Sequence, residues 1–130
     1  MKRLIVGLAM SLYAATSFAH GAGSQGDKLT GEIVDITCYL DHDSMGLGHA
    51  KCARACALKD MPVGLLVGNT LYTIVLSGHE SPNKKLAAFA GKTVTVTGHK
   101  LEKSGLHAID MERIELAPKE AAAKHAPEGR

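Results

Sequence analysis

The sequence contains few of the residues that build large recognition surfaces. It has no tryptophan, and aromatic residues make up only 4% of the chain. Basic residues number 15 and acidic ones 13, but Lys2 and Arg3 belong to a leader-like N-terminus, so the rest of the chain carries 13 of each. A basic face for nucleic acid and an aromatic platform for stacked bases are therefore not expected.

Long apolar runs are also scarce, and the one at the N-terminus is short. Basic Lys2 and Arg3 precede the apolar run 4–10, and Ser17-Phe18-Ala19 has the small-x-small pattern of a cleavage site. This pattern predicts a secretory signal peptide over residues 1–19, too short to act as a spanning helix. We expect a periplasmic or secreted protein, and no cysteine follows the run to carry a lipid anchor.

Cysteine is the third scarce residue, and all of it lies in one segment. The three cysteines, Cys38, Cys52 and Cys56, fall within residues 37–62, with His42 and His49 between them. An exported protein normally pairs its cysteines, so an odd count leaves one that is free, linked to another chain or bound to something else. The segment is therefore where a function can be sought.

The rest of the chain predicts one small β domain over residues 28–116. A Gly- and Ser-rich lead-in (20–27) precedes it, and a tail without apolar anchors (117–130) is expected to be disordered or a frayed helix. Apolar and β-branched patterns predict five strands, with a hairpin turn at Gly68-Asn69 and a bend or bulge at Gly98. The expected strands and helices are strands 28–40, 63–67, 70–76, 93–100 and 106–116, and helices 49–59 and 82–90.

This order of elements predicts an OB-like β-barrel. Without the cysteine segment, three strands, a helix and two strands follow one another, as in OB barrels. The cysteine segment would then be an enlarged loop-helix after strand 1, with the short helix between strands 3 and 4. A split α+β sheet is the main alternative.

Particular stretches resemble a family of small exported bacterial proteins with an OB-fold-like domain and a three-Cys loop. The ending G-K-T-V-T-V-T-G-H-K-L-E-K-S-G-L-H-A-I-D-M-E-R-I is similar to the last two strands of such proteins. The pieces D-I-T-C-Y-L, H-A-K-C-A-R-A-C and M-P-V-G-L-L resemble the three-Cys members. The resemblance covers most of residues 29–116 and implies a fold and a compartment, but no activity.

The spacing of the candidate donors predicts a metal site. On a helix over 49–59, His49, Cys52 and Cys56 share one face, and Cys38 would end the first strand where the loop folds back. Three thiolates and one imidazole suit tetrahedral zinc, and thiolates near a methionine such as Met45 also suit copper(I). The function predicted is binding of a copper or zinc ion through Cys38, His49, Cys52 and Cys56.

Two other interpretations remain open at this stage. A disulfide from Cys38 to Cys52 or Cys56 would contribute roughly 3 kcal/mol and would leave a binding module for a periplasmic protein or small ligand. A thiol redox role is the other, although no C-x-x-C pair is present. Enzyme motifs are absent, so catalysis is not expected. Asp35 is either an inward or edge carboxylate of the first strand or an ordinary solvent-facing strand residue, and the solvent-facing position is the one expected.

Overall fold

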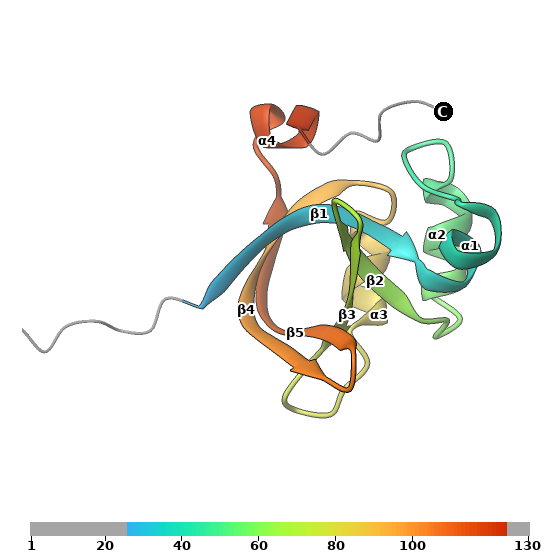
Figure 1. The fold of residues 1–130 in the computed structure, drawn as a ribbon. Helices are drawn as coiled ribbons and strands as arrows, with labels where there is room; N and C mark the ends of the chain where they lie inside the picture. Colours follow the sequence, from blue (N-terminus) through green and yellow to red (C-terminus); the bar gives the residue numbers. More distant parts are fainter. Residues whose placement is uncertain (1–25, 125–130) are drawn as a thin grey trace, which may run out of the picture.

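A computed structural model describes residues 26–124. The predicted signal peptide, most of the lead-in and the last six residues lie outside this range. The described chain is mainly β, with five strands and several short helices (Figure 1). The strands are β1 (Asp27–Asp35), β2 (Val63–Val67), β3 (Thr70–Val75), β4 (Thr93–Lys103) and β5 (Leu106–Leu116). The helices are α1 (Ile36–His42), α2 (Ala50–Ala57), α3 (Asn83–Leu86), the 3-10 helix η1 (Ala87–Phe89) and α4 (Lys119–Lys124).

The five strands close into a barrel in the order β1-β2-β3-β5-β4. β1 pairs antiparallel with β2 through its C-terminal half and with β4 through its N-terminal half. β3 and β5 pair in parallel and complete the ring. The predicted OB-like barrel is confirmed, with the cysteine-bearing helices after β1 and the short helical stretch α3–η1 between β3 and β4.

Two glycines lie at the turn and at the bulge that the sequence predicted. Gly68 has a φ of 58° in the tight turn that joins β2 and β3, a conformation that glycine adopts without a steric penalty. Between Thr97 and Gly98 the register of β4 against β5 shifts, which marks a β-bulge. Because a bulge increases the local twist, the long β4 can serve both β1 and β5.

The barrel interior is filled by aliphatic side chains from strands and helices. Ile33, Leu65, Val94, Val96 and Ile109 are at most 1% exposed and belong to one continuous core cluster. Leu86 of α3 is fully buried in the same cluster, so the helical stretch between β3 and β4 is held by the core. Ala57 of α2 also joins this cluster, which ties the cysteine segment to the barrel.

The first strand ends earlier than the sequence pattern suggested. β1 stops at Asp35, and α1 begins at Ile36, so Cys38 lies in the first turn of a helix rather than at the end of a strand. The cause is local: a carboxylate oxygen of Asp35 accepts a hydrogen bond from the backbone N–H of Cys38 at 2.7 Å, which caps the helix. The apolar, β-branched run through Ile36 masked this capping signal.

The C-terminal tail also carries regular structure within the described range. The sequence predicted disorder or a frayed helix from residue 117 onward, and Lys119–Lys124 form the short helix α4. Alanine and lysine favour helix locally, which accounts for this turn and a half without an apolar anchor.

Candidate metal-binding site

Two short helices bring the cysteine segment back against the outside of the barrel. α1 follows directly from β1, and α2 returns beside it, close to the point where β1 ends (Figure 1). α2 packs on η1, α3 and β1, and its two buried residues are Ala53 and Ala57. Because alanine is small, these residues let the helix approach the barrel closely, and the cysteines of α2 are left on its less buried side.

The three cysteines meet in space. The Sγ atoms of Cys38 from α1 and of Cys52 and Cys56 from α2 all lie within 4.8 Å of one another. All three are free thiols, so no disulfide is present in this segment. Within residues 26–124 this is the one group of three or more Cys, His, Asp or Glu side chains close enough to hold a metal ion.

The separation of the sulfurs is close to that of a loaded site. A zinc–sulfur bond of about 2.3 Å in tetrahedral geometry places two sulfurs about 3.8 Å apart. The sulfurs therefore need to move together by no more than about 1 Å to share an ion. Cys52 is exposed, while Cys38 and Cys56 are half-buried, so an ion would reach the group from the Cys52 side.

Two of the thiols are held in the protonated form. Burial is the largest cause that raises the pKa of Cys38. For Cys56, hydrogen bonding with Asp35 is the largest cause, and the pKa rises to about 11. A neighbouring carboxylate disfavours a second negative charge, so both thiols stay neutral near pH 7 unless a cation replaces their protons.

Asp35 is the buried acid beside these thiols. Only 1% of the residue is exposed, so the expectation of a solvent-facing position was wrong. Its Oδ1 accepts the Cys38 N–H, and its Oδ2 is buried with no conventional hydrogen-bond partner. The thiols of Cys38 and Cys56 are the groups on which its carboxylate acts. An aspartate three residues before a cysteine, at a position that can start a helix, was the sequence signal for this role.

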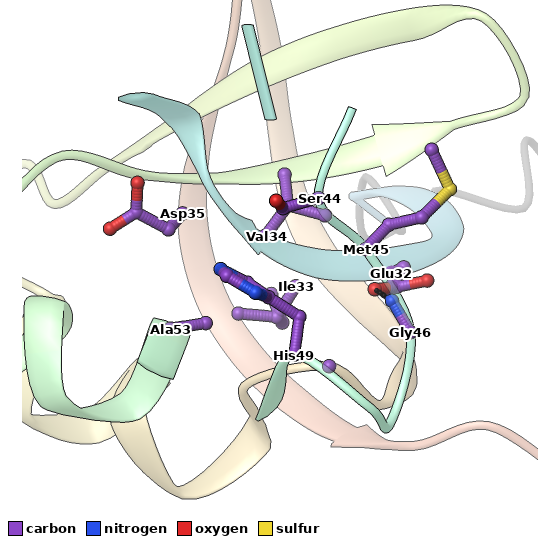
Figure 2. Close-up of a pocket in the computed structure, with 10 residues that line it drawn as sticks. Glu32, Ile33, Val34, Asp35, Ser44, Met45, Gly46, His49 and Ala53 are labelled. Carbon is purple, nitrogen blue, oxygen red and sulfur yellow. Dashed lines mark hydrogen bonds between the residues drawn. The ribbon is translucent and has the colours of Figure 1, made fainter. Parts of the chain in front are cut away.

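His49, the predicted imidazole ligand, lies outside the thiol group. It precedes α2 as its N-cap residue, and its Nε2 is buried without a partner. The pocket around its ring is lined by Glu32, Asp35 and Met45, among others (Figure 2). In this view the Asp35 carboxyl group points away from the His49 ring. The structure therefore brings together three of the four predicted ligands.

Glu32 shares the His49 pocket and fixes the loop between α1 and α2. Its carboxylate accepts a hydrogen bond from the backbone N–H of Gly46 (Figure 2). Glu32 is 7% exposed, and burial raises its pKa, while the nearby His49 opposes that rise. His49 and Glu32 thus line one pocket against β1, apart from the three thiols.

Three other histidines form surface ion pairs. His42 contacts Asp41 at 2.9 Å, and the side chains of both residues are about 70% exposed. His99 lies 3.2 Å from Glu112, and His107 lies 3.7 Å from Glu102. Such exposed pairs contribute little to stability. His99 and His107 each face a glutamate on the opposite strand.

Comparisons with known proteins found no match that bears on this site. No family model, no curated protein and no solved structure matches this chain. Over residues 26–124, no helix has the length and apolar character needed to cross a membrane.

The unequal surroundings of the thiols predict unequal reaction with an alkylating reagent. In the metal-free, reduced protein at pH 8, iodoacetamide should modify Cys52 first, because its side chain is exposed. Cys56 should react most slowly, since the thiolate is the reactive form and the pKa of this thiol is raised to about 11. Its rate should keep increasing as the pH rises toward that value. Peptide mass spectrometry over a time course measures the order, and equal rates at the three positions would contradict it.

Proposed function

We propose that this protein binds one transition-metal ion, zinc or copper, through the thiolates of Cys38, Cys52 and Cys56. The observation that carries the proposal is the convergence of three free sulfurs from two helices to within 4.8 Å. Thiolates are the preferred protein ligands of copper(I) and are common ligands of zinc. Three donors leave one coordination position for a further ligand.

The electrostatics of the group favour metal binding over thiol redox chemistry. A redox-active cysteine needs a lowered pKa, because the thiolate is the nucleophile. Here the pKa values of Cys38 and Cys56 are raised by burial and by the carboxylate of Asp35. A metal cation reverses this balance, since it attracts the thiolates and the carboxylate alike.

The proposal includes export. The basic start, the apolar run and the small-x-small site of residues 1–19 support cleavage before His20 and a periplasmic location. In that oxidising compartment, a bound ion would also keep three neighbouring thiols from forming a disulfide. A metal therefore accounts for an odd number of cysteines held close together.

Native mass spectrometry of the protein isolated from the periplasm tests this function. We expect a mass that begins at His20, plus one metal ion, and three thiols that a blocking reagent modifies only after denaturation with a chelator. The identity of the ion follows from the added mass. One blockable thiol and no added mass would instead establish a disulfide-stapled binding module, and retention of residues 1–19 would contradict export.

A further inference from the structure

The three sulfurs leave the fourth position of a tetrahedral ion open, and a buried oxygen lies beside them. Asp35 Oδ2 has no conventional hydrogen-bond partner, although the residue is 99% buried. Buried carboxylate oxygens without a partner are costly, and native proteins rarely leave them so. This oxygen belongs to the same carboxyl group that acts on the thiols of Cys38 and Cys56.

We propose that Asp35 is the fourth ligand of the metal site and that it makes the site prefer a divalent ion. The inference rests on the proposed metal binding by the three thiolates. It replaces His49, the donor expected from sequence spacing, with a buried oxygen of the residue that caps the helix of Cys38. A site of three thiolates and one carboxylate is chemically suited to zinc-like ions.

The position of Asp35 is fixed before any ion arrives. It ends β1, where it pairs with Val63 of β2, and its Oδ1 is held by the N–H of Cys38 at 2.7 Å. This hydrogen bond orients the carboxyl group and leaves Oδ2 unoccupied. Asp35 does not belong to the group in which all donors lie within 4.8 Å of one another. Cys52 is the exposed thiol of the three, so it is the donor with the most room to move inward.

Loading the site makes contact between Asp35 and the ion necessary. As a divalent cation binds, each of the three thiols forms a metal–sulfur bond and releases its proton to solvent. The buried carboxylate of Asp35 would then face thiolates without compensation. A bond from Oδ2 to the ion removes this repulsion.

Charge also explains the preference for a divalent ion. Three thiolates and one carboxylate carry four negative charges, of which a divalent ion neutralises two and copper(I) only one. Asp35 is almost fully buried, so the charge that remains after binding is poorly solvated. The difference in remaining charge between a divalent ion and copper(I) therefore has a large effect on binding. Copper(I) moreover binds well to thiolates alone, so a bond to the carboxylate adds little to its binding free energy.

Asp35→Asn is the matched variant that tests the inference. Asparagine caps helices as well as aspartate does, so the hydrogen bond to the Cys38 N–H is retained. Titration of the full mature chain with cobalt(II), a spectroscopic substitute for zinc, should give thiolate-to-cobalt charge-transfer bands in the wild type. We expect Asp35→Asn to lower the affinity for cobalt(II) and zinc(II) about 10- to 100-fold and to leave that for copper(I) unchanged or higher.

A second readout reports on the fourth position itself. Added imidazole should leave the cobalt(II) spectrum of the wild type unchanged, because Asp35 fills that position, and should change the spectrum of Asp35→Asn. His49→Gln removes the other candidate donor and should behave as the wild type. Should Asp35→Asn fail to fold, the imidazole test on the wild type and the His49→Gln variant still decide between the donors.

The outcomes separate this inference from the proposed function. If the wild type binds none of the three ions, the proposed metal binding itself fails. If it binds them, but Asp35→Asn has the same affinities and spectrum, or His49→Gln loses cobalt(II) affinity instead, Asp35 is not the fourth ligand. Wild-type binding of copper(I) alone would keep the thiolate site and overturn the divalent preference.

Discussion

Replacing Cys56 by serine should lower the affinity for the proposed metal ion by about two orders of magnitude or more. Structural zinc sites bind with about 10–16 kcal/mol, so one ligand of four accounts for about 3 kcal/mol, or about 100-fold. Cys56 is one of the three converging donors, and its thiol interacts with Cys38, Cys52 and Asp35. Serine keeps the size of the side chain but is not deprotonated near neutral pH. Competition with a chromophoric chelator measures the loss.

Ala55→Ser is the matched control for this experiment. It introduces the same hydroxyl one residue away on α2, at an exposed position. We expect wild-type metal affinity from it, because Ala55 is not among the three converging residues. Equal affinity of Cys56→Ser and the wild type would remove this site from consideration, provided that both proteins unfold in the same cooperative transition.

Gly98→Ala should destabilise the barrel more than any other glycine-to-alanine substitution. A Cβ at this position would lie 2.0 Å from the carbonyl oxygen of Asp110 and 3.1 Å from the Cα of Met111. Both contacts are with the backbone of β5, which cannot swing away as a side chain can. We expect the free energy of unfolding to fall by about 3 kcal/mol or more, above the usual range for overpacking. Urea denaturation followed by circular dichroism measures it.

Gly78→Ala is the control for that variant. Gly78 lies on an exposed loop after β3, and a Cβ there meets nothing within 4 Å. The free energy of unfolding should change by less than about 0.5 kcal/mol. If the two variants were equally stable, the bulge at Gly98 would not need a residue without a side chain.

The barrel was largely predictable because its signals are local and periodic. Alternating apolar residues in β4, the Gly68-Asn69 turn and the helix stop at Gly91 each act over a few residues. Their order along the chain then selects a small number of topologies. The clustering of Cys38 with Cys52 and Cys56 was also predictable, because two cysteines four residues apart on a helix face the same way.

The identity of the buried acid was not predictable in the same way. Whether Asp35 faces solvent or the thiols depends on the residue at which β1 ends, and the β-branched run through Ile36 and Thr37 conceals that point. His49 instead lies in a pocket that it shares with Glu32, a residue distant in sequence. Helical spacing assigned His49 to the cysteine face, but it only begins α2 and turns toward β1. Residue spacing indicates which side chains share a face of one helix or strand, but it does not indicate the residue at which that helix or strand ends.

The two ends of the cysteine segment lie next to each other on neighbouring strands. Asp35 pairs with Val63, and the N–H of Ile36 donates to the carbonyl of Pro62 at 3.0 Å. Residues 36–62 therefore form an insertion that leaves the barrel after β1 and returns at β2. The pairing of β1 with β2 is the same as if a short hairpin turn joined the two strands. A change in the length of the insertion or in its donor residues therefore need not shift the register of β1 against β2. The fold thus separates the strand pairing, which the barrel requires, from the inserted segment, which carries the donors of the proposed metal site.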